Sequence, residues 1–113
     1  MVVGTGIIEL FVDSSRSLKE KRAVLRSILS RTKNKFNISI AEVGDLDDWK
    51  RCKIGFSLVG NERGFINSKV DKVVNFVEGL QLAHIVNVDI EIYSISDTRI
   101  GCSQNGFDEF QES

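Results

Sequence analysis

Apolar residues recur in this sequence with two different periods, and the two periods alternate along the chain. In four segments every second residue is apolar, which is the spacing of a strand with one buried face. The residues on these faces are Ile8, Leu10, Val12, Ile38, Ile40, Ile54, Phe56, Leu58, Val86, Val88, Ile90 and Ile92. Two further segments have a helical stripe with spacings of three and four, made by Leu18, Leu25, Ile28, Leu29, Thr32 and Phe36 and by Ile66, Val70, Val73, Val77 and Leu80.

These segments follow one another in the order β-α-β-β-α-β, which is the split βαβ arrangement of ferredoxin-like folds. We therefore predict an α+β fold in which an antiparallel sheet of strand order 4-1-3-2 carries two helices on one face, because both crossovers are right-handed. The first strand is expected over residues 5–12. The even-numbered residues of the first and third strands should face the helices.

The length of 113 residues suits one domain. We expect the ferredoxin-like domain to span residues 1–95, with Ser17 and Glu20 forming a capping box at the start of its first helix. Residues 96–113 carry four acidic residues against one arginine and few aliphatic ones, so we predict a mobile acidic tail there.

The first helix is unusually basic. Residues 16–36 contain eight lysines and arginines and a single acidic residue, Glu20. On a helical wheel, Lys19, Arg22, Arg26 and Lys33 fall on one flank of the apolar face, and Lys21, Arg31 and Lys35 fall on the opposite flank. Such rows can neutralise the phosphates of a nucleic acid. The alternative is a solvated surface whose long side chains shield the edge of the core.

The sheet face turned away from the helices is expected to be partly apolar, because Ile7 and Phe11 point to that side. In RNA-recognition motifs, aromatic residues on the two central strands stack on bases. Here only Phe11 is suitable, which argues against that mode of RNA binding. The face is instead suited to covering by a second subunit, with Ile7 and Phe11 as interface residues.

Four acidic residues, Glu42, Asp45, Asp47 and Asp48, cluster just before Trp49. Oxygen-rich clusters can hold Mg²⁺ or Ca²⁺. Their spacing is not that of an EF-hand, so an Asp-rich turn is the preferred interpretation, and we assign no metal site. Trp49 is expected to anchor packing or a contact surface.

No pattern of a catalytic nucleophile is present. Cys52 and Cys102 lie far apart and read as free thiols, with Cys52 in the core because it shares the parity of Ile54. His84 is expected in a loop. We assign no catalytic residue and no cofactor.

Three strings in this sequence resemble a known family: Ser17 to Arg22 (SLKEKR), Lys35 to Val43 (KFNISIAEV), and Asp48-Trp49 followed by Gly55. Their order and separation resemble the YlxP family of small, uncharacterised bacterial proteins, over roughly residues 3–92. The resemblance implies a ferredoxin-like fold and no established activity. Genes of that family often neighbour those for translation initiation and ribosome maturation, which implies an association with RNA or ribosomes. The acidic segment after Ile95 departs from the family's usual ending.

We therefore interpret the chain as a non-enzymatic binding module that acts on RNA or a ribosomal component through its first helix. The alternative function is a homo-oligomeric interaction domain that uses the exposed sheet face. A metal-dependent enzyme built on Glu42, Asp45 and Asp48 is a third hypothesis. A cytoplasmic location is expected, because the start of the chain lacks a basic signal-peptide region and no apolar run has the length of a membrane span.

Overall fold

The computed structural model describes residues 1–96. The elements along the chain are β1 (Val2–Phe11), α1 (Leu18–Lys35), β2 (Ser39–Gly44), β3 (Arg51–Gly60), α2 (Arg63–Gly79) and β4 (His84–Ser94). Apart from Ser96, the predicted acidic tail and Cys102 lie outside the described residues.

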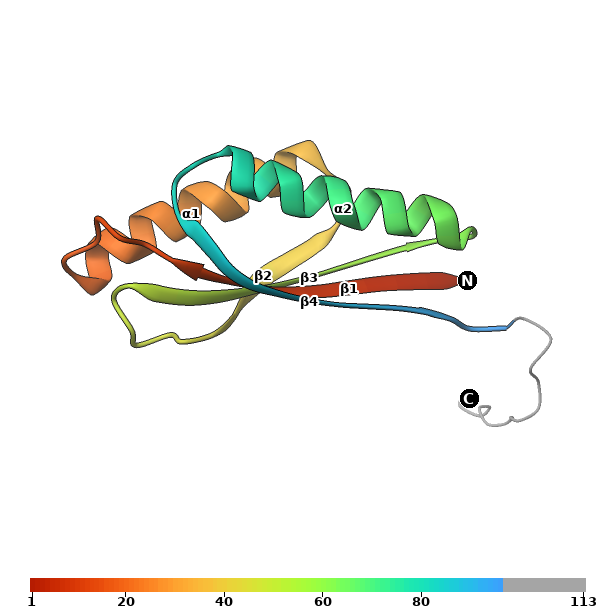
Figure 1. Ribbon diagram of the computed structural model, residues 1–113, viewed down its shortest axis with the longest axis horizontal. Helices are drawn as coiled ribbons and strands as arrows, with labels where there is room; N and C mark the ends of the chain where they lie inside the picture. The colour runs from red at the N-terminus through yellow and green to blue at the C-terminus, as the bar shows by residue number, and fades with distance from the viewer. Residues whose placement is uncertain (97–113) are drawn as a thin grey trace, which may run out of the picture.

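The four strands form one sheet in the order β2-β3-β1-β4, with every neighbouring pair antiparallel. This is the predicted order 4-1-3-2 seen from the opposite edge, and the α+β, ferredoxin-like prediction is confirmed. Both helices cover the same face of the sheet, and no helix within the described residues 1–96 lies over the other face (Figure 1). Among residues 1–96, no helix is long and apolar enough to cross a membrane.

The core lies between the sheet and the two helices. Ile8, Leu10 and Ile54 are buried from β1 and β3, as the parity of these strands predicts. Ile66 and Val70 belong to the stripe of α2 and are fully buried against them. Apolar area removed from water drives this layer together, because each fully buried aliphatic side chain contributes about 1.5–3 kcal/mol.

β1 begins three residues before its predicted start. Its ladder with β3 extends back to Val2, which pairs with Gly60, and Val2 also pairs with Ser94 on β4. The missing side chain of Gly4 lets α2 approach, since a Cβ there would lie 2.6 Å from Ile66 Cγ2. A glycine that looks like a strand breaker is here a point of close packing.

The regular alternation predicted for β4 is wrong at Val86. Glu9 pairs with Asn87 but Leu10 pairs with Ile85, so a β-bulge leaves Val86 without a partner and 53% exposed. Ile90 is 40% exposed for a different reason, because β4 is an edge strand.

Candidate nucleic-acid interface

The start of α1 is held by the side chains that the sequence indicates. Ser17 Oγ accepts the amide of Glu20 at 3.2 Å, as the first half of a capping box requires. The return bond differs, because Glu20 Oε1 accepts the amide of Arg16 at 2.7 Å and not that of Ser17. The cap sets where the helix begins and so sets the position of the basic residues that follow.

Lys19, Arg22, Arg26 and Lys33 are all exposed on α1, as the helical wheel predicts. Within residues 1–96, none of the four lies within 4 Å of a carboxylate oxygen, and none makes a side-chain hydrogen bond. The four residues are called the basic row below. As far as residues 1–96 are concerned, their charges face solvent without an acidic partner.

Three members of the basic row border a shallow depression. Lys19, Arg22 and Arg26 line it with Leu18 and Ala23, and its volume is about 400 Å³. The small side chain of Ala23 leaves space between the longer ones. Lys33 lies further along the helix and does not line the depression.

The opposite flank of α1 is not what the sequence predicts. Arg31 and Lys35 are exposed, but Lys21 is completely buried. Lys21 Nζ donates a 2.6 Å hydrogen bond to the carbonyl of Asp45 and lies 3.5 Å from Glu42 Oε2. Lys21 therefore belongs to the interior and is unavailable to a partner.

The acidic cluster before Trp49 separates into residues with structural roles. Glu42 faces Lys21, as described above. Asp48 Oδ1 accepts the amides of Lys50 and Arg51, each at 2.8 Å, and these two bonds hold the pKa of Asp48 below its ordinary value. Among the described residues, no three His, Cys, Asp or Glu side chains are arranged to hold a metal ion. Trp49 is 51% exposed and does not anchor the core.

The uncovered sheet face carries the two residues that the sequence assigns to an interface. Ile7 is 41% exposed there. Phe11 is half-buried, and Lys50 Nζ lies 5.7 Å from the centre of its ring. A base therefore has no open pair of neighbouring aromatic rings on the central strands to stack on.

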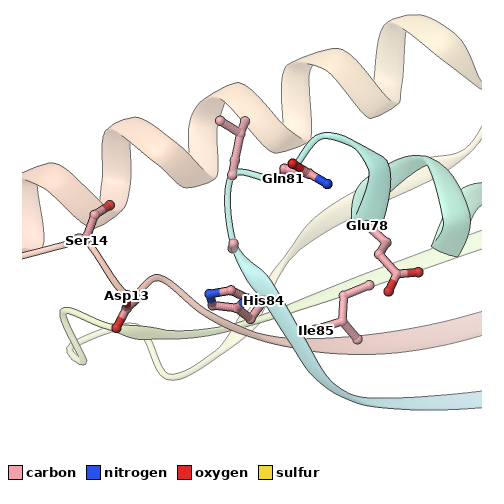
Figure 2. Close-up of a pocket in the computed structure, with 8 residues that line it drawn as sticks. Asp13, Ser14, Glu78, Gln81, His84 and Ile85 are labelled. Atoms are coloured by element: carbon pink, nitrogen blue, oxygen red, sulfur yellow. The ribbon is translucent and has the colours of Figure 1, made fainter.

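The structure contains a pocket that is not predicted from the sequence. Asp13 and Ser14 from the β1–α1 connection meet Glu78, Gln81 and the residues up to Ile85 around a cavity of about 580 Å³ (Figure 2). His84 is the first residue of β4, so its predicted loop position is wrong. Within residues 1–96, no hydrogen bond links the side chains of Ser14, His84 and Asp13.

Cys52 is fully buried in the core, as predicted. Burial raises the pKa of its thiol to about 11. The thiol therefore stays protonated at neutral pH and is a poor nucleophile.

The sequence profile of a family of proteins of unknown function, DUF503, matches residues 3–90. The chain belongs to the DUF503 family. A relative from Bacillus subtilis (strain 168), the uncharacterized protein YlxP, is 39% identical over 77 residues, which cover 68% of this chain and 84% of that protein. The resemblance stated from the three strings is confirmed.

A solved structure is similar to this DUF503 chain in fold. A crystal structure of a candidate chlorite dismutase superposes with a TM-score of 0.50 at 12% identity, over 100% of this chain and 53% of that one, so the chain spans about half of its length. A de novo designed protein, Foldit4, matches with a TM-score of 0.48 at 11% identity, over 85% of this chain and 100% of the design.

Proposed function

We propose that the protein is a binding module that holds an RNA backbone against α1. The observation that carries the proposal is the basic row, Lys19, Arg22, Arg26 and Lys33, whose four charges are exposed and unpaired within residues 1–96. At 1.5 Å per residue, the row extends for roughly 21 Å along the helix axis, which is enough to follow several phosphates.

Helix stability does not explain the row. Lys19 lies in the first turn of α1, where the partial positive charge of the helix end disfavours a cation. Arg22 and Arg26 are four residues apart, a spacing at which like charges repel and destabilise a helix by about 0.2–0.5 kcal/mol. Lys33 is the exception, because a cation in the last turn is favourable. A partner with negative charge supplies a reason for the other three.

The mode of binding would differ from that of an RNA-recognition motif. Among residues 1–96, Phe11 is the one aromatic residue on the exposed side of the central strands, and it is half-buried, with Lys50 Nζ 5.7 Å from its ring centre. We therefore expect contacts with phosphates, limited sequence preference and a strong dependence on salt.

The test is a titration of the full chain with a fluorescently labelled RNA hairpin from about 50 to 200 mM salt. Substituting both Arg22→Gln and Arg26→Gln should weaken binding and lower the salt slope by about 1.5, from 0.7–0.9 per lost phosphate contact. The matched control is Arg31→Gln with Lys35→Gln, which removes the same charge from the opposite flank. Absence of binding at 50 mM salt, equal effects of the two double variants, or binding to anionic vesicles but not to RNA would each contradict the proposal.

A further inference from the structure

No helix or strand of residues 1–96 covers the sheet face opposite α1 and α2 (Figure 1). Its central strands are β1 and β3, which are paired along their whole length. The residues that point away from the helices there are Val3, Thr5, Ile7, Glu9 and Phe11 on β1 and Arg51, Lys53, Gly55, Ser57 and Val59 on β3. Antiparallel sheets can have one face in water, so exposure by itself shows no partner. The shape of this face and the arrangement of its charges give more specific information about a partner.

The middle of the face is low. A hollow of about 530 Å³ crosses it, lined largely by small side chains such as Thr5, Ala41 and Ser57 and by Gly55. Ile7 lines this hollow and lies directly opposite Gly55 in the register of the two strands. The side chain of Val43 lies over Gly55, since a Cβ there would be 2.9 Å from Val43 Cγ1. The face therefore exposes two apolar side chains, Ile7 and Val43, at the hollow.

The charged residues of the two central strands are also complementary to one another. Glu9 on β1 is opposite Lys53 on β3, and Phe11 is opposite Arg51. Within the described residues, neither Glu9 nor Lys53 lies within 4 Å of a group of opposite charge. Within residues 1–96, Glu9 and Lys53 are thus free to pair with charges on a partner.

A second copy of this chain fits these features. Consider a two-fold axis parallel to the strands, midway between β1 and β3. It places β1 of each copy over β3 of the other. Each β1 residue then faces, in the second copy, the same β3 residue that it pairs with in its own sheet. Ile7 then meets the exposed Val43 side chain over Gly55 of the second copy. Glu9 meets Lys53 of the second copy, and each contact occurs twice, as in an isologous interface. Phe11 meets Arg51 of the second copy, a pairing that favours cation–π contact. Asp89 and Glu91 fall at the rim, near the Ser39 hydroxyl of the second copy.

The size of the face is adequate. β1 and β3 have 10 residues each, β2 has 6 and β4 has 11. At about 4.8 Å between strands and about 3.4 Å per residue, they cover roughly 600 Å². A standard interface buries about 800 Å² of each partner, so a dimer of modest affinity is expected. Twisted sheets that pack in this way keep their strands within about 30° of each other.

We propose that the uncovered face is the interface of a homodimer in which β1 of each copy packs across β3 of the other, with Glu9 opposite Lys53. The helices lie on the outside of this dimer, so the basic row of each copy remains accessible. The dimer does not depend on RNA binding, and the two proposals can be tested separately.

Charge reversal tests the pairing. Glu9→Lys gives a face with two lysines, and Lys53→Glu gives a face with two glutamates. Each variant should dissociate at least about tenfold more readily than the native chain in sedimentation velocity at tens of micromolar, because like charges then face each other. An equimolar mixture of the two should form a one-to-one heterodimer, since each lysine then meets a glutamate. The chain with both substitutions should regain the native dimer.

Asp71→Lys is the matched control, because Asp71 is exposed on α2 and the charge change equals that of Glu9→Lys. It should leave the dimer unchanged, and circular dichroism should show that every variant is folded. A native chain that is monomeric at tens of micromolar overturns the proposal. So do single variants that remain dimeric, or a mixture that fails to pair. The RNA titration of the Arg22 and Arg26 variants is independent of all three results.

Discussion

The ammonium group of Lys21 on α1 lies 3.5 Å from Glu42 Oε2 on β2, and Lys21 has no exposed surface. Lys21 belongs to one of the sequence strings on which the family resemblance rests, and Glu42 belongs to another. The same lysine binds the carbonyl of Asp45 at the start of the β2–β3 connection, a residue with φ of 58°. These two strings therefore meet in a structural link between α1 and the sheet.

Breaking this link should destabilise the fold. Lys21→Met retains the apolar stem but leaves Glu42, whose side chain is 14% exposed, without its counter-charge. We expect a loss of about 3 kcal/mol in the free energy of unfolding, as for a buried pair deprived of one partner. Lys21→Met with Glu42→Gln should be more stable than Lys21→Met alone. Urea denaturation measures both, and Lys19→Met, at an exposed site, should stay within about 0.5 kcal/mol of the native chain.

Arg22→Glu should separate stability from binding. A glutamate at position 22 lies four residues before Arg26, the favourable order for an ion pair on a helix surface, and replaces a repulsive pair. The free energy of unfolding should rise by a few tenths of a kcal/mol, while affinity for an RNA hairpin falls. Thermal denaturation measures the change in stability, and the RNA titration measures the change in affinity. A variant that loses stability and affinity together would indicate that Arg22 supports the fold.

Asp48 should make stability depend on pH in the acid range. Its folded pKa is lowered, first by the amide of Lys50 and then by that of Arg51, from the ordinary 3.8. A lowered pKa contributes stability above 3.8, and this contribution disappears as the pH falls through the folded value. The stability difference between the native chain and Asp48→Asn should therefore shrink below about pH 4. Asp47→Asn is the control, and an Asp48 difference that stays constant from pH 6 to pH 2 would refute the assignment.

Cys52 should resist alkylation in the folded protein. With the thiol pKa raised to about 11, about one molecule in a thousand carries the thiolate at pH 8. In a Cys102→Ser chain, where Cys52 is the sole cysteine, iodoacetamide should react at least a hundredfold faster after unfolding in guanidinium chloride than before. Similar rates in the two states would mean that the site is open to solvent.

The positions of the strands and helices, and much of the core, follow from the sequence alone. Period-two runs place Ile8 and Ile54 in the core, and the stripe of α2 places Val70 and Val73 against them. These predictions succeed because burial on one face is a local pattern that repeats within each element. The exposure of the basic row is predictable for the same reason, since a helical wheel relates residues that are neighbours in sequence.

Only the tertiary structure decides which charged residue is buried and where the register between two strands shifts. Lys21 falls on the same flank of the helical wheel as Arg31 and Lys35. It is nevertheless buried, because β2 and the turn after it bring Glu42 and Asp45 to its side of α1. The bulge at Val86 and the pocket between Asp13 and His84 likewise depend on contacts between distant segments. Local periodicity determines which face of an element is apolar, whereas the partner of a polar group depends on packing between elements.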